Sequence, residues 1–175
     1  IDPDDHWVNV GLTELVAGGT RRGIRTKGSI VLVTGDSGII ERCTVQLQDR
    51  DRKCRKRLRD GVCVDCGPQR GEEDLRIRMV LDDGISNVSL LLSKEPAEHF
   101  LGMTQAEVSE MISREGQDFF LSSVREKALG RSVSVNGLAL IDDQGAMLLA
   151  DSVQDDGMSA STAAEKAIER WEVVM

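Results

Sequence analysis

Four cysteines carry the clearest chemical signal in this sequence, and they all fall within one short polar stretch. They are Cys43, Cys54, Cys63 and Cys66, in the spacing C-x10-C-x8-C-x2-C. The close spacing of the second pair lets two thiolates reach one ion, and four thiolates complete a closed tetrahedral zinc site with no open position for a substrate. The pattern therefore predicts one structural Zn²⁺.

Two disulfides, or four ordinary thiols, are the alternatives to a metal site. We expect no secretory leader, because the chain begins at Ile1 without a cationic or apolar leader segment, and this disfavours disulfides. Four buried thiols would need apolar neighbours, which the stretch lacks. The first gap is longer than the usual two to about four residues, so His6 or His99 is the substitute if Cys43 is not a ligand.

Basic residues around the cysteines are the candidate contacts to nucleic acid, because phosphate groups are neutralised by Lys and Arg. Single strands are also held by stacking of bases on aromatic rings, but the sequence has no Tyr, two Trp and three Phe. Because aromatic residues are scarce, we expect weak, strongly salt-dependent binding, although the formal net charge is −8 and the basic residues are clustered locally. The alternative is a solvated charged face. The candidates are Arg42, Arg55, Lys56, Arg57, Arg59, Arg76 and Arg78.

Strand and helix patterns lie on both sides of the cysteine stretch. Residues 43–71 lose hydrophobic periodicity, so we expect metal rather than an apolar core to hold them. Helical spacing follows over 96–115, with Thr104 as a candidate N-cap, and again over 119–129. A turn at 34–38 makes the first two apolar runs either one kinked strand or a short hairpin. The predicted strands cover 24–33, 39–42, 75–81, 88–92, 132–140 and 146–150.

The order of these elements predicts a mainly β fold. A five-stranded barrel with a helix between its third and fourth strands is the OB arrangement. We expect a lead-in segment at 1–23, the barrel at 24–153 with a zinc ribbon inserted at 43–67, and a C-terminal helix at 159–175. The apolar stripe of that helix consists of Ala164, Ala167, Ile168, Trp171 and Val174.

Three segments together resemble the zinc-containing OB domain of archaeal replication protein A. They are Ile-Glu-Arg-Cys at 40–43, Leu-x-x-Gly-x-Cys at 58–63 and Asp-Asp-Gly at 82–84, and the resemblance spans about 24–153. That family commonly has its first two ligands two residues apart and often ends with His, whereas here residues 44–51 are additional and the last ligand is Cys66. The resemblance implies binding of single-stranded DNA in replication, repair and recombination, and association with partner subunits through the C-terminal helix.

A DNA-binding domain is therefore the function that the sequence favours, in the cytoplasm with nucleoid DNA. The alternative is a protein-interaction module that assembles a replication complex and binds little DNA itself, which the acidic charge and scarce aromatics favour. We do not expect an enzyme, because two distant histidines supply no Ser-His-Asp or Cys-His set. No apolar run has the roughly 18 residues of a membrane span.

Overall fold

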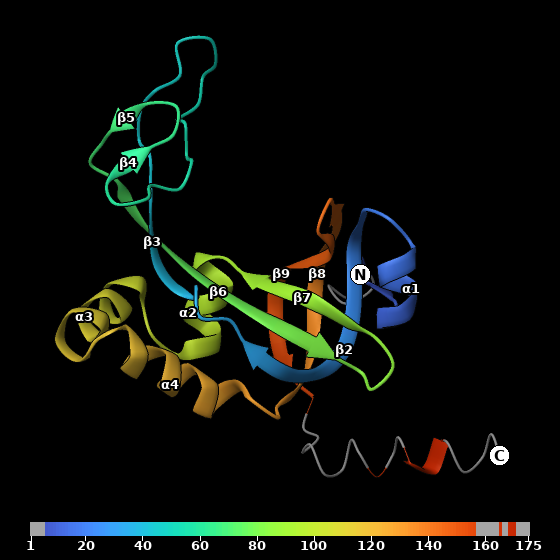
Figure 1. The fold of residues 1–175 in the computed structure, drawn as a ribbon. Coiled ribbons are helices and arrows are strands. Elements are labelled where there is room, and N and C mark those ends of the chain that lie inside the picture. The colour runs from blue at the N-terminus through green and yellow to red at the C-terminus, as the bar shows by residue number, and fades with distance from the viewer. Residues whose placement is uncertain (1–5, 157–164, 166–167, 171–175) are drawn as a thin grey trace.

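A β-barrel and three helices between two of its strands make up most of the computed structural model, which describes residues 6–156, 165 and 168–170 (Figure 1). None of the described helices has the length and apolar content to cross a lipid bilayer. The elements are β1 (Val8–Asn9), α1 (Leu12–Ala17), β2 (Arg21–Val33), β3 (Gly38–Arg42), β4 (Val62–Cys63), β5 (Gly67–Pro68), β6 (Glu72–Asp82), β7 (Asn87–Leu92), α2 (Lys94–Leu101), α3 (Gln105–Glu115), α4 (Gln117–Ala128), β8 (Ser132–Asp142) and β9 (Gly145–Asp155).

The barrel closes through five strands. β2 pairs with both β6 and β8, β6 pairs with β7, β7 runs parallel to β9, and β9 pairs with β8. In chain order this is the strand circuit 1-2-3-5-4-1, with the helices between the third and fourth strands, and it confirms the predicted OB barrel. Apolar side chains alternate inward along each strand, so that Leu75, Ile77, Met79 and Leu81 of β6 are fully buried.

β2 and β3 are one kinked strand rather than a hairpin, because both pair antiparallel with successive parts of β6. The kink is held by Ser37, whose hydroxyl accepts a hydrogen bond from the Arg78 backbone N–H at 2.9 Å and donates to the Arg78 carbonyl at 3.1 Å. Gln117 of α4 donates to the Ser37 carbonyl at 2.7 Å. The kink turns the chain away from the barrel, and the cysteine segment therefore projects beyond it (Figure 1).

The helical region contains three helices where two were expected. Gly102 adopts a left-handed conformation with φ of 67° and ends α2, so the predicted helix over 96–115 is broken. Thr104 then caps α3 as predicted, accepting a hydrogen bond from the Glu107 N–H at 3.2 Å. Gly116, with φ of 97°, separates α3 from α4, which begins two residues before the predicted start.

The two ends of the chain differ in how far the structure describes them. The N-terminal segment packs on the barrel, because Leu12 and Leu15 of α1 are buried in the main core. The C-terminal helix predicted at 159–175 lies almost entirely outside the described residues. Of its apolar stripe, only Ile168 is described, in a helical conformation with 58% of its surface exposed.

Candidate metal centre and nucleic-acid interface

The four cysteine sulfurs converge on one point in the inserted segment. All four Sγ atoms lie within 4.8 Å of one another, none forms a disulfide, and the Cys54 and Cys63 sulfurs are 3.8 Å apart. A tetrahedron of thiolates about 2.3 Å from a central ion has edges of about 3.8 Å, so this set is compatible with a metal. Among the described residues, neither His6 nor His99 joins the cluster.

The long gap between the first two cysteines is closed by a hairpin. The Cys54 N–H donates to the Val45 carbonyl at 2.8 Å, and the Leu47 N–H donates to the Arg52 carbonyl at 3.1 Å. The Cys43 carbonyl also accepts from the N–H of Arg55 at 2.9 Å. The additional residues therefore form the end of a hairpin, and its base places the first two sulfurs side by side.

A tight turn positions the second pair of cysteines. Asp60 and Gly61 have positive φ values of 52° and 75°, and Arg59 and Val62 exchange two backbone hydrogen bonds of 3.0 Å across them. Two consecutive left-handed residues define the type I′ turn, which favours Asp-Gly. β4 follows directly and pairs with β5, so the last two cysteines lie at the ends of a two-residue loop.

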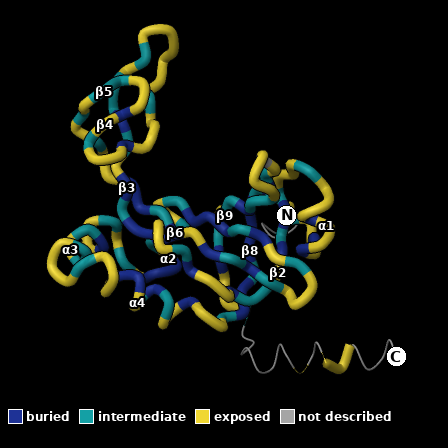
Figure 2. The backbone as a smooth tube through the Cα atoms, in the orientation of Figure 1, coloured by how far each residue is buried: buried dark blue, intermediate teal, exposed yellow. Residues whose placement is uncertain are grey.

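A small apolar cluster surrounds the sulfurs, which corrects the expectation that the insert has no core. Leu58 is only 6% exposed and packs with fully buried Cys43 and Cys63, and Val45 lies against them. A Cβ atom placed on Gly71 would lie 2.6 Å from Leu58 Cδ1, so the residue just before β6 needs to be glycine for the chain to pass this close to the cluster. Most of the insert's outer surface is nevertheless exposed (Figure 2).

The thiols of the cluster differ in acidity. A hydrogen bond from the backbone N–H of Asp65, with a further one from that of Cys66, lowers the pKa of Cys63 to about 7, whereas burial raises the pKa of Cys66 to about 12. Deprotonation of these thiols is linked to metal binding, because the thiolate is the ligand. Of these two thiols, Cys63 therefore has the pKa closer to neutral pH.

Four of the seven predicted nucleic-acid contacts line one hollow of about 140 Å³ where the insert meets the barrel: Arg42 of β3, Arg57 of the insert, and Arg76 and Arg78 of β6. Asp36, Ile40 and Leu91 complete its wall. The alternation of β6 explains two of the arginines, since residues between the buried apolar positions point outward. Neither the position of Arg57 nor that of Asp36 could be read from the sequence.

The other three predicted contacts lie in the insert and outside this hollow. Arg55 pairs with Glu72 at 2.9 Å, and Lys56 forms an ion pair with Asp65 that raises the pKa of the lysine. Arg59 lies in the turn before β4 and is exposed. Unlike Arg55 and Lys56, Arg57 has no ion pair with any described residue, and it is exposed.

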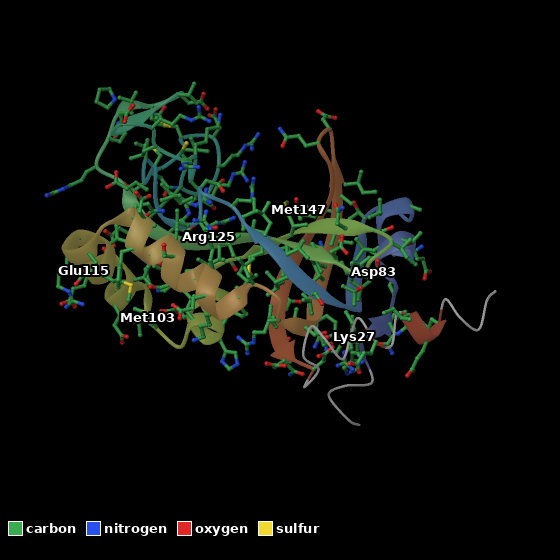
Figure 3. The ribbon with its side chains drawn as sticks, turned by 60° about the horizontal axis from the view of Figure 1, so that its bottom comes forward. Lys27, Asp83, Met103, Glu115, Arg125 and Met147 are labelled. Carbon is green, nitrogen blue, oxygen red and sulfur yellow. The ribbon has the colours of Figure 1, made fainter. Side chains whose placement is uncertain are left out.

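An apolar row that sequence reasoning missed runs from the hollow across the outside of the sheet. Arg78 lies opposite Leu91, which lies opposite Leu149 of β9, which lies opposite Leu138 of β8. Met147 belongs to the neighbouring row, and Figure 3 shows it on the side of the barrel that faces the insert, whereas Lys27 lies on the opposite side. Only the strand register reveals these rows, because their members are distant in sequence.

The fold and this site define an OB barrel with a four-cysteine insert. No protein-family model and no curated protein matches the chain. Its structure is similar to a chain of a replication protein A heterotrimer bound to single-stranded DNA (TM-score 0.57, 12% identity, 95% of this chain and 40% of that one). It is also similar to a chain of yeast replication protein A bound to single-stranded DNA (TM-score 0.54, 14% identity, 95% and 97%).

An archaeal domain is a further structural neighbour, the second OB-fold domain of replication protein A from Methanococcus maripaludis (TM-score 0.42, 14% identity, 87% and 98%). At these identities, the two likenesses with TM-scores above 0.5 show a shared fold. The chain spans 40% of the length of the heterotrimer chain that it matches.

Proposed function

We propose that this chain is a single-stranded DNA-binding domain of a replication protein A-like protein, acting in DNA replication, repair and recombination. One observation carries the proposal: four arginines from β3, the insert and β6 line a single hollow. In OB folds the face of the second and third strands, together with the loop between the first and second, holds oligonucleotides. Here those parts are β6, β7 and the cysteine insert.

Zinc is the metal that the four cysteines fit best. A set of four thiolates favours Zn²⁺ in a tetrahedral site without an open position, and such a site stabilises a fold rather than catalysing a reaction. Bound zinc would hold the 43–54 hairpin against the 63–66 loop, which share only a small apolar cluster. It would therefore fix the position of Arg57 relative to β6.

The apolar row gives the bases a surface to pack on. Leu149 and Leu138 of this row, and Met147 of the neighbouring row, are half-buried and continue around the barrel from Leu91 onto β9 and β8. Other OB domains stack bases on aromatic rings. Aliphatic side chains bury apolar area but lack a π-face for stacking. We expect weak affinity with little preference among bases.

The ligand of the two similar structures supports single-stranded DNA binding by this chain. The two similar replication protein A structures are bound to single-stranded DNA. A binding role without catalysis, and a location with chromosomal DNA, follow from the same proposal.

An assembly module is the second candidate, and the charge distribution favours it. The chain carries a net charge of −8, and several of its basic side chains are already paired with acids. One of the similar chains belongs to a heterotrimer. In this alternative the domain contacts partner subunits, through the C-terminal segment containing Ile168, and other domains bind the DNA.

Metal content and oligonucleotide binding, measured on the same sample, test the proposal. A labelled dT strand of about 16 nucleotides covers the site size of one OB fold, and its anisotropy is followed at low salt. We expect one zinc per chain and binding that weakens as salt rises. Cys63→Ser should lose the metal and reduce the affinity.

Three outcomes separate the candidates. Salt-dependent binding by the metal-loaded protein, competed by unlabelled single strands better than by duplex, supports the proposed function. Stoichiometric metal without any binding favours the assembly role. A protein that folds and binds equally well without metal would contradict the structural role of the cysteine cluster.

A further inference from the structure

A buried carboxylate lies behind the arginine hollow without lining it. Asp74 of β6 is 9% exposed, and its Oδ2 atom accepts from Arg42 Nε at 2.5 Å and from Arg76 Nε at 3.1 Å. Burial alone would raise the pKa of Asp74, but the two arginines more than offset this and hold the pKa below its ordinary value. The carboxylate is therefore ionised at neutral pH and holds two of the four arginines.

The atoms used in these ion pairs decide how the guanidinium groups are presented. Both arginines bind Asp74 through Nε, the donor nearest to the side-chain stem. The two terminal nitrogens of Arg76 remain available, and one terminal nitrogen of Arg42 donates to the Arg55 carbonyl at 3.0 Å. A guanidinium fixed at Nε can still direct terminal N–H groups toward a phosphate oxygen.

The same carboxylate joins the barrel to the insert. Arg42 connects Asp74 of β6 with the backbone of the residue that follows Cys54. The side chains of Arg42 and Asp74 are 17% and 12% exposed, so the pair is largely shielded from solvent and salt. Long arginine side chains lose considerable rotamer freedom when they bind, and a partner that orders them beforehand reduces this cost.

We propose that Asp74 is a positioning residue for nucleic-acid phosphate: it holds Arg42 and Arg76 by their Nε atoms so that their terminal N–H groups face the hollow. This inference rests on the proposed function of the hollow and assigns a role to an acid within it. It predicts that removing a negative charge weakens the binding of a polyanion. Simple electrostatics predicts the opposite sign, because a less acidic site attracts phosphate more strongly.

Asp36 supplies the matched control. It lines the same hollow, but its carboxylate is 45% exposed and lies 3.9 Å from Arg78 Nη1, too far for a hydrogen bond that would orient the guanidinium. Asp36→Asn therefore reports the effect of charge with little loss of positioning. We expect it to tighten binding about two- to threefold, the size of an exposed ion pair.

The experiment compares wild type, Asp74→Asn and Asp36→Asn, each loaded with zinc, by anisotropy with a labelled dT strand. Asp74→Asn should weaken binding about tenfold, because the charge-assisted contacts of two arginines are no longer ordered beforehand. Thermal melting and zinc content are measured alongside. If Asp74→Asn does not fold, Arg76→Lys tests the inference instead. Lysine keeps the positive charge, but with a single nitrogen it cannot bind Asp74 and at the same time present two further N–H groups to a phosphate, as arginine can.

Each result bears on the inference. A loss for Asp74→Asn together with a gain for Asp36→Asn supports it, as does a several-fold loss for Arg76→Lys. Binding by Asp74→Asn that equals or exceeds wild type refutes it, as does an equal loss for Asp36→Asn or unchanged affinity for Arg76→Lys. Absence of binding by wild-type protein refutes the proposed function itself, and is distinct from these results.

Discussion

Replacing Arg57 with alanine should change the salt dependence of DNA binding by a calculable amount. For single strands, the logarithm of the binding constant falls with the logarithm of salt concentration by about 0.7 per phosphate neutralised. Four arginines line the hollow, so the wild-type slope should be no steeper than about −2.8. Arg57 has no ion pair with a described acid, and its removal should bring the slope to about −2.1.

These slopes correspond to easily measured differences in affinity. Between about 50 and about 200 mM salt, wild type should lose roughly 50-fold in affinity and Arg57→Ala roughly 20-fold. Anisotropy titrations at several salt concentrations give both values. The control is Arg114→Ala, because Arg114 lies on α3 with its side chain 66% exposed and pairs with Glu110 and Glu115.

The slope decides whether the hollow is the phosphate site. An unchanged slope in Arg57→Ala, or an equal decrease in Arg114→Ala, would refute that assignment. Figure 3 shows Glu115 at the helical end of the molecule, so an effect at Arg114 would indicate a nonspecific response to net charge. Arg57→Lys should retain the slope, because counterion release depends on charge rather than on the guanidinium geometry.

Three further predictions concern the insert and the apolar row. Gly71→Ala should lower the free energy of unfolding by about 1–3 kcal/mol and weaken zinc binding, because the new Cβ would lie 2.6 Å from Leu58. The control Gly35→Ala, whose Cβ would have no atom within 4 Å, should change the free energy of unfolding by less than about 0.5 kcal/mol; chemical denaturation measures both. The number of protons released when one zinc binds should fall by about one between about pH 6 and pH 8, because Cys63, with a pKa of about 7, already loses its proton in the metal-free protein over this range. Calorimetry in buffers of different ionisation enthalpy measures this number, and a fall centred near the ordinary pKa of a thiol would contradict the prediction. Leu149→Phe should tighten binding of a dT strand by up to about tenfold and leave an abasic strand unaffected; equal gains on both would show that bases do not contact this row.

The cysteine site could be predicted from sequence because it depends on local information. All four ligands lie in one stretch, and two of them are separated by only two residues. The barrel was similarly accessible, since the alternation of Leu75 to Leu81 specifies which face of β6 is buried. Patterns of this kind require no knowledge of what each strand pairs with.

Features that depend on pairing between distant segments could not be predicted in the same way. The ten-residue gap looked unsuited to a zinc knuckle, and only hydrogen bonds such as Cys54 to Val45 show that it forms a hairpin. The break at Gly102 was missed because an apolar period continues through it on both sides. Likewise, Asp74 reads as one more outward polar residue until the two arginines beside it are located.

The acidic composition of the chain is compatible with DNA binding once the hollow is considered by itself. Four arginines face it, and Asp36 and Asp74 reduce their excess to two positive charges. Such a site attracts phosphate only at short range, because salt screens charges beyond about 8 Å at physiological ionic strength. Weak, local attraction becomes effective when a linked domain already holds the strand nearby, since the second contact is then intramolecular. A domain of this kind should therefore contribute more to the binding of long strands by a multidomain assembly than its isolated affinity indicates.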